Sequence, residues 1–127
     1  MCDKEVVSGN RILYIDDDES NTKLMKRVLE ADGYEVLLAS NGSMGLAQAN
    51  RERPDLILLD IYMPDMSGHE VARRLRRLQH TRHIPIVMVS TSASSLDRIL
   101  SSQAGCCGYI TKPINIDCIS SQVAAFL

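Results

Sequence analysis

Short apolar runs alternate along the chain with longer segments in which apolar residues recur every three or four positions. The apolar runs, which predict β-strands, lie at residues 11–15, 35–39, 56–59, 86–89 and 108–110. The periodic segments, which predict helices, lie at about residues 20–31, 43–51, 68–78, 94–104 and 116–126. Strands that alternate with helices are typical of a parallel sheet with helical crossover connections. The pattern therefore predicts an α/β fold built from five such pairs.

Apolar residues at helical spacing predict which side of two of these helices faces the sheet. In the segment 68–78 the inward residues should be Val71, Leu75 and Leu78. In the segment 94–104 they should be Leu96, Ile99 and Leu100.

Polar side chains directly follow four of the predicted strands. They are Asp16, Asp17 and Asp18 after the first strand, Asp60 after the third, Ser90 after the fourth and Lys112 after the fifth. Ligands of open α/β sheets bind beyond the carboxyl ends of the strands, so we expect these side chains to meet at one edge.

A cluster of this kind has a definite chemistry. Carboxylates at the rim of an apolar core repel one another unless a cation or a proton intervenes. Mg²⁺ prefers oxygen ligands and is commonly held by one or two carboxylates together with a phosphate oxygen. Lys112 and Ser90 could pair with that same phosphate. The residues therefore predict a phosphoryl site that uses Mg²⁺.

Each of these side chains also has a purely structural explanation. The acids at 16–19 precede a predicted helix and could cap its N-terminus. Asp60 could end its strand in a turn, Ser90 could bond to the backbone, and Lys112 could be a surface lysine. Their joint placement after four strands favours a common site over these separate explanations.

Length and charge narrow the class of protein. With 127 residues, of which 45% are hydrophobic, the chain is expected to form a single domain over residues 1–127. A formal net charge of −2 gives no reason to expect nucleic acid or an anionic membrane as partner. No apolar run approaches the roughly 20 residues that span a bilayer, and acids occupy the first residues, where a secretion signal would be apolar. We therefore expect a cytoplasmic protein.

The four cysteines are expected to be reduced thiols. They are Cys2, Cys106, Cys107 and Cys118. They form no C-x-x-C pair and have no accompanying histidine cluster, as a zinc site would require.

Four segments of the sequence resemble the receiver domains of two-component response regulators. These segments are ILYIDDDES, LILLDIYMPDMSG, PIVMVST and GYITKP, in this order, within a resemblance that extends over about residues 10–127. The resemblance implies a doubly wound, five-stranded parallel sheet with the flavodoxin-like (βα)5 receiver fold. This agrees with the element pattern read from hydrophobicity.

The resemblance also implies a metal site and a phosphoacceptor. Asp60 would accept the phosphoryl group, and Asp16 and Asp17 would form the acidic pair. Mg²⁺ would be bound by Asp17, Asp60 and the backbone carbonyl of Tyr62, with Asp16 acting mostly through a metal-bound water.

Signalling residues follow from the same resemblance. Ser90 stands at the switch Ser/Thr position, Tyr109 at the position of the aromatic that changes rotamer, and Lys112 at the position of the phosphate-pairing lysine. Pro113 would form a cis peptide with Lys112. In the family, residues at the positions of Tyr62 and Ser92 influence how quickly phosphate is lost.

Partners are implied as well. A histidine kinase or a histidine phosphotransfer protein would donate the phosphoryl group from a phosphohistidine. A downstream effector would bind the face formed by residues 94–104, 108–110 and 116–126. The receiver would catalyse only its own phosphorylation and dephosphorylation. The sequence leaves open whether activation drives homodimerisation, and whether the chain acts alone or within a larger regulator or hybrid kinase.

Some positions depart from the common family pattern. They are Thr91, Cys106, Cys107 and Ile114. None is expected to touch the phosphate, although Thr91 could alter the switch.

Four other functions are suggested by single features of the sequence. A haloacid-dehalogenase-like phosphatase would need a second acid two residues after Asp60, where this chain has Tyr62. An EF-hand beginning at Asp16 would need Gly at position 21 and Glu at position 27, which are Asn21 and Arg27. The arginines at 73–77 could suggest DNA binding, but no helix-turn-helix follows. A docking module that is never phosphorylated is the remaining alternative.

Overall fold

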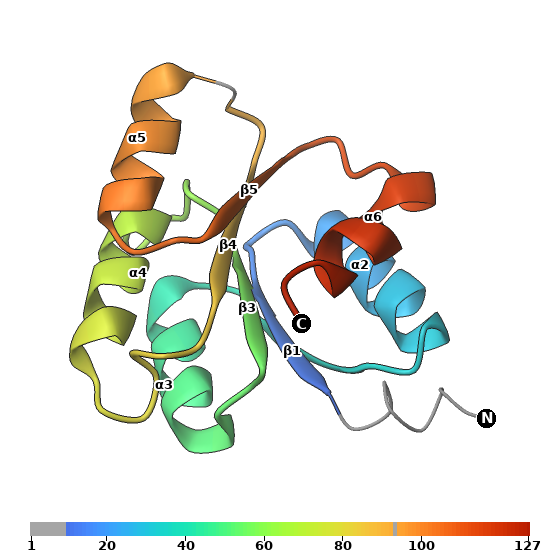
Figure 1. The fold of residues 1–127 in the computed structure, drawn as a ribbon, viewed down its shortest axis with the longest axis horizontal. Helices are drawn as coiled ribbons and strands as arrows, with labels where there is room; N and C mark the ends of the chain where they lie inside the picture. The colour runs from blue at the N-terminus through green and yellow to red at the C-terminus, as the bar shows by residue number, and fades with distance from the viewer. Residues whose placement is uncertain (1–9, 93) are drawn as a thin grey trace.

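The computed structural model describes residues 10–92 and 94–127 (Figure 1). In chain order its elements are β1 (Arg11–Ile15), α2 (Glu19–Ala31), β2 (Glu35–Ala39), α3 (Gly42–Glu52), β3 (Leu56–Leu59), α4 (Gly68–Arg77), β4 (Ile86–Ser90), α5 (Ser95–Gln103), β5 (Gly108–Thr111) and α6 (Ile116–Ala124). The predicted alternation of strands and helices is confirmed. Among the residues described, no helix combines the length and the apolar character that crossing a bilayer requires.

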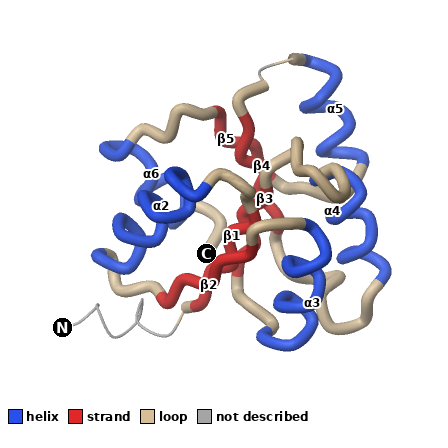
Figure 2. The backbone as a smooth tube through the Cα atoms, turned by 180° about the vertical axis from the view of Figure 1, so that it is seen from behind, coloured by secondary structure: helices blue, strands red, loops and turns tan. Residues whose placement is uncertain are grey.

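The five strands form one parallel sheet in the order β2-β1-β3-β4-β5. After β2 the chain passes back over β1 to place β3 on its other side, so the strand order reverses between β1 and β3. Helices α2 and α6 cover one face of the sheet, and α3, α4 and α5 cover the other (Figure 2). This is the doubly wound, flavodoxin-like (βα)5 fold, and its ligand site is expected at the reversal point.

The central strands are apolar on both sides because helices cover both faces of the sheet. All four residues of β3 are buried, as are all five of β4. Alternate residues supply two separate cores. Ile57, Leu59 and Met88 belong to the core beneath α3 and α4, whereas Leu58 and Val87 belong to the core beneath α2 and α6. The two cores hold the strand ends, and therefore the site, in a fixed frame.

One predicted helix face is wrong. Leu96 and Ile99 of α5 are 64% and 53% exposed, although their spacing predicted that they point inward. The inner side of α5 instead carries Asp97 and Ser101, both of which are buried. Hydrogen bonds make this burial favourable, because Ser101 Oγ donates to the Asp97 carbonyl oxygen at 2.7 Å and lies 3.1 Å from His69 Nε2 on α4.

The end of α4 also differs from its prediction. Val71 and Leu75 are fully buried as expected, but Leu78 is 38% exposed because the helix ends at Arg77 and the backbone of Leu78 is extended. The other element ends lie within two residues of their predicted positions, which is the usual uncertainty for helix termini.

The thiols in the described part of the chain are free. Cys106, Cys107 and Cys118 form no disulfide there. The prediction for Cys2 falls outside the described residues.

Candidate functional site

Three carboxylates meet at the point where the strand order reverses. Asp16 follows β1 and Asp60 follows β3, and these strands pair in register up to Ile15 and Leu59. The two backbones remain joined there, since Asp60 N donates to the carbonyl oxygen of Ile15 at 2.9 Å. Carboxylate oxygens of Asp16, Asp17 and Asp60 all lie within 4.8 Å of one another. The structure therefore brings together the acids that the sequence placed at strand ends.

Asp18 does not join this cluster. Its carboxylate accepts hydrogen bonds from Ser20 N at 2.9 Å and from Asn21 Nδ2 at 3.2 Å, which caps the N-terminus of α2. Helix capping thus explains Asp18, and Asp16, Asp17 and Asp60 remain as candidate metal ligands.

Lys112 supplies a cation inside the cluster. Its Nζ lies 2.7 Å from Asp16 Oδ2 and 3.6 Å from Asp60 Oδ1, and the lysine side chain is only 8% exposed. The backbone N–H of Lys112 donates to the Ser90 carbonyl oxygen at 2.8 Å, which fixes the residue at the end of β5. The Lys112–Pro113 peptide is cis, as expected.

Asp16 has a further partner that the sequence reading missed. The hydroxyl of the buried Tyr14 donates to Asp16 Oδ2 at 2.5 Å, while Asp18 N donates to Oδ1 at 2.9 Å. Burial raises the pKa of Tyr14, and the charge of Asp16 raises it further, so the phenol remains a donor. The i, i+2 spacing of Tyr14 and Asp16 on a strand was the only signal for this contact.

The charges of the cluster are not balanced. Asp60 is only 7% exposed, and this burial, together with the charge of Asp16, raises the pKa of the Asp60 carboxyl from 3.8 to about 6. Lys112 opposes the shift only in part, and Asp17 adds to it. Three clustered carboxylate groups and one ammonium fit a hard divalent cation, for which oxygen is the preferred donor.

The loop after Asp60 folds tightly back onto the strand. Gly68 N donates to the Ile61 carbonyl oxygen at 2.6 Å, and a Cβ added at Gly68 would lie 2.2 Å from the carbonyl oxygen of Asp60. Only glycine fits this close approach. Asp65 anchors the same loop, because its carboxylate accepts from the backbone N–H groups of Gly42 and Ser43, both at 2.9 Å.

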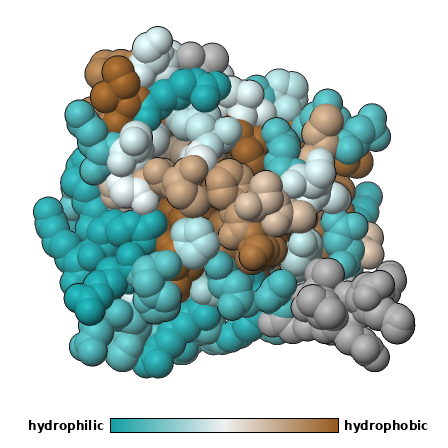
Figure 3. Space-filling model, in the orientation of Figure 1, coloured by the Kyte–Doolittle hydropathy of each residue, from teal (hydrophilic) through white to brown (hydrophobic). Residues whose placement is uncertain are grey.

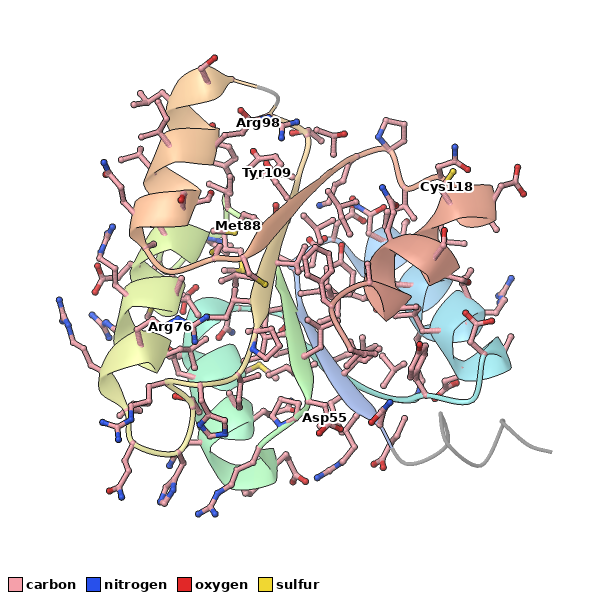
Figure 4. The ribbon with its side chains drawn as sticks, viewed as in Figure 1. Asp55, Arg76, Met88, Arg98, Tyr109 and Cys118 are labelled. Atoms are coloured by element: carbon pink, nitrogen blue, oxygen red, sulfur yellow. The ribbon has the colours of Figure 1, made fainter. Side chains whose placement is uncertain are left out.

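Ser90 and Tyr109 are linked through Ser92. Ser90 is fully buried, and its Oγ accepts a hydrogen bond from Ser92 N at 3.2 Å. The Tyr109 hydroxyl donates to the carbonyl oxygen of Ser92 at 2.8 Å. The guanidinium of Arg98 on α5 lies 4.6 Å from the centroid of the Tyr109 ring (Figure 4). Movement of the segment after Ser90 would therefore reach Tyr109.

Asp97 is a second residue that the sequence reading missed. Its Oδ2 accepts from the Tyr62 hydroxyl at 2.7 Å and from Ser92 Oγ at 2.6 Å. The hydrogen bonds from Ser92 and Tyr62 lower the pKa of Asp97, which stays ionised. The sequence pattern Ser94-x-x-Asp97 is typical of a helix start, but it predicts only a helix cap at this position. The cap is present, because Ser94 Oγ accepts a hydrogen bond from Asp97 N at 3.1 Å.

Comparison with known proteins gives the family. The response regulator receiver domain model matches residues 12–124, nearly the whole chain. The chain therefore belongs to the response regulator receiver domains, the class that its fold defines.

Two response regulators are similar to this chain over most of its length. The chain is 38% identical over 116 residues to the polar-differentiation response regulator DivK of Brucella anthropi, covering 91% of this chain and 94% of DivK. It is 44% identical over 105 residues to the response regulator PleD of Caulobacter vibrioides, covering 83% of this chain but only 23% of PleD.

A solved structure bears on the metal. The receiver domain of the sensor histidine kinase PA1611 from Pseudomonas aeruginosa superposes with a TM-score of 0.86 at 28% identity, covering 94% of this chain and 98% of that one. That protein was crystallised with a magnesium ion coordinated in its active site cleft.

Proposed function

We propose that this chain is a phosphoacceptor receiver of a two-component phosphorelay, and that Asp60 takes the phosphoryl group. The observation that carries the proposal is the cluster at the strand-order reversal, where the buried Asp16, Asp60 and Lys112 side chains meet the exposed carboxylate of Asp17. An acidic cluster beside one lysine suits a group that is itself anionic and arrives with a divalent cation.

The residues that would hold Mg²⁺ are Asp17, Asp60 and the backbone carbonyl of Tyr62, with Asp16 acting through a water. When bound, Mg²⁺ supplies positive charge to the phosphoryl oxygens. The magnesium ion of the PA1611 receiver supports this assignment by family likeness.

The protein residues then have distinct tasks in the transfer. A carboxylate oxygen of Asp60 forms a bond to phosphorus as the P–N bond of a donor phosphohistidine breaks, and the bonding pair leaves with the imidazole nitrogen. Lys112 leaves its 2.7 Å contact with Asp16 to pair with a phosphoryl oxygen, which offsets the added negative charge. Hydrolysis at the same site returns the carboxylate and releases phosphate, so the domain catalyses only its own phosphorylation and dephosphorylation.

The signal passes through Ser90 to the face of α5, β5 and α6. The phosphoryl group draws the Ser90 hydroxyl, and the hydrogen bonds of Ser92 transmit the shift to Tyr109. This biases an existing equilibrium between two surfaces. Leu96 and Ile99 of α5 are exposed and offer apolar contact area to an effector. Figure 3 shows hydrophobic surface at the upper left, where α5 lies in Figure 1.

The partners follow from this role. A histidine kinase or histidine phosphotransfer protein of the cytoplasm is the donor, and an effector protein or domain is the acceptor of the signal. Homodimerisation on activation through the same face is compatible with this role.

The second candidate is a docking module that is never phosphorylated. Incubation with acetyl phosphate and Mg²⁺ separates the two functions, because only a phosphoacceptor acquires acid-labile phosphate, and a chelator should prevent it. A chain that remains unlabelled while still binding its effector would favour docking alone.

A further inference from the structure

A second cavity lies at the opposite end of the sheet from Asp60. Its volume is about 610 Å³, and it opens between the segment that enters β3 and the loop that enters β4. The polar side chains that line it are Arg53, Asp55, Gln79, His80, Arg82 and His83. In Figure 4, Asp55 marks this end of the molecule, and Tyr109 lies toward the other.

The lining of this cavity carries uncompensated positive charge. Among residues 10–92 and 94–127, neither Arg53 nor Arg82 forms an ion pair. Asp55 is the one acid in the lining, and its Oδ2 already accepts from the backbone N–H of Arg11 at 2.7 Å. The two arginines of the lining therefore outnumber its one acid, whereas Arg73 and Arg74 of α4 lie outside the lining and pair with Glu70. The cavity therefore attracts anions.

One wall of the cavity is rigidly built. Arg76 Nη1 donates to the carbonyl oxygens of Arg82 at 2.9 Å and Ile84 at 2.8 Å, while its Nε and Nη2 donate to that of Gly105. Thr81, which is fully buried, donates to the Leu75 carbonyl oxygen at 2.7 Å. The loop that carries Arg82 and both histidines is thus held before any ligand arrives, which lowers the entropic cost of binding.

Arg53 on the opposite wall is conformationally unusual. It ends α3 with φ 49° and ψ 64°, the left-handed region that glycine commonly occupies at this position of a helix. The chain carries a cationic side chain there, at the cost of backbone strain. Strain of this kind is a reason to look for a function of the side chain.

We propose that this cavity binds a small anion with a diphosphate group, of nucleoside diphosphate size or smaller. The volume lies in the range of small-molecule sites. Guanidinium groups of Arg53 and Arg82 can each pair with phosphate oxygens through two N–H donors. The positive charge of the lining is confined to a cavity of about 610 Å³ between two segments, which suits a compact anion better than the extended backbone of a nucleic acid. The proposal does not depend on phosphorylation of Asp60.

Backbone amide NMR of the whole chain tests this anion site. The protein is titrated with inorganic pyrophosphate and, separately, with ADP. Both titrations are run with a chelator and without Mg²⁺, so that the acidic cluster at Asp60 repels the same anions. Saturable shifts are expected at residues 53–55 and 79–84. Tighter binding of ADP would identify a nucleotide as the ligand, and equal affinities would show that the diphosphate group suffices; both outcomes support the site.

Variants make the test specific. Arg82→Gln should raise the Kd about tenfold, the effect of losing one charge-assisted contact. Arg53→Gly should weaken binding similarly without unfolding the protein, because glycine accepts the left-handed backbone. Arg27→Gln is the matched control, since Arg27 is exposed on α2, outside the cavity lining. The proposal is overturned if no saturable shift occurs at millimolar anion or if the shifts survive Arg53→Gly and Arg82→Gln. It is also overturned if a DNA duplex, titrated in the same way, shifts these residues when pyrophosphate and ADP do not.

Discussion

Replacing Asp60 by asparagine should stabilise the metal-free protein near neutral pH. The side chains have the same shape, but asparagine removes the charge of a buried side chain that lies beside two other acids. Burial and the charge of Asp16 raise the Asp60 pKa from 3.8 to about 6, even with Lys112 nearby. One pKa unit corresponds to about 1.4 kcal/mol. At pH values above the Asp60 pKa of both the unfolded and the folded state, the ionised carboxylate therefore destabilises the folded protein by about 3 kcal/mol.

The pH dependence has a definite sign. A carboxyl whose pKa is raised by folding binds its proton more tightly in the folded state, so its contribution to stability improves as pH falls from about 6 toward 3.8. Urea unfolding in the presence of a chelator should therefore show Asp60→Asn as the more stable protein at pH 7.5. The advantage should shrink as pH falls below 6 and approach zero only below 3.8, where the wild-type carboxyl becomes protonated in the unfolded state as well.

Added Mg²⁺ provides the internal control for this prediction. The cation should raise the stability of the wild type more than that of Asp60→Asn, because the variant lacks one of the carboxylates that would hold it. A variant that is no more stable than the wild type at pH 7.5 in chelator would refute the electrostatic reasoning about the cluster.

Three further predictions concern neighbouring residues. Lys112→Ala should uncouple phosphorylation from effector binding, and a normal effector response in a pull-down of the phosphorylated variant would contradict this. Gly68→Ala should lower the free energy of unfolding by about 3 kcal/mol or more, because the new Cβ would lie 2.2 Å from the Asp60 carbonyl oxygen; an unchanged denaturant midpoint would show that the loop yields easily. Asp97→Ala should destabilise the protein near neutral pH by removing the acceptor of Tyr62 and Ser92. Folding lowers the pKa of Asp97, so the ionised carboxylate stabilises the protein at pH values above the pKa of the unfolded state. This stabilisation is lost as pH falls through the lower pKa of the folded state. In matched urea titrations, the stabilities of wild type and Asp97→Ala should therefore converge in strong acid.

Much of the fold could be predicted because its rules are local. Apolar runs such as 56–59 and 86–89 are buried on both faces of a parallel sheet, and the polar residues that end them fall at one edge by topology alone. For this reason the sequence alone predicts that Asp16, Asp60 and Lys112 lie together.

The rest depends on contacts between distant residues. Helical periodicity predicted that Leu96 and Ile99 face inward, but hydrogen bonds with α4 and with the 90–92 segment made it favourable to bury Asp97 and Ser101 instead. The run of arginines at 73–77 gives no sequence signal for burial, yet Arg76 is half-buried and donates hydrogen bonds to three backbone carbonyl oxygens. Neither arrangement has a periodic signature, since each depends on which loop packs against the helix.

The function proposed for this chain requires that Asp60 be the residue that becomes phosphorylated. Treatment with acetyl phosphate and Mg²⁺, followed by borohydride reduction, converts an aspartyl phosphate to homoserine, and peptide mass spectrometry then locates the changed residue. We predict homoserine at position 60 alone, with none formed in the presence of a chelator. Homoserine at another aspartate, or acid-labile labelling that persists in Asp60→Asn, would contradict the account.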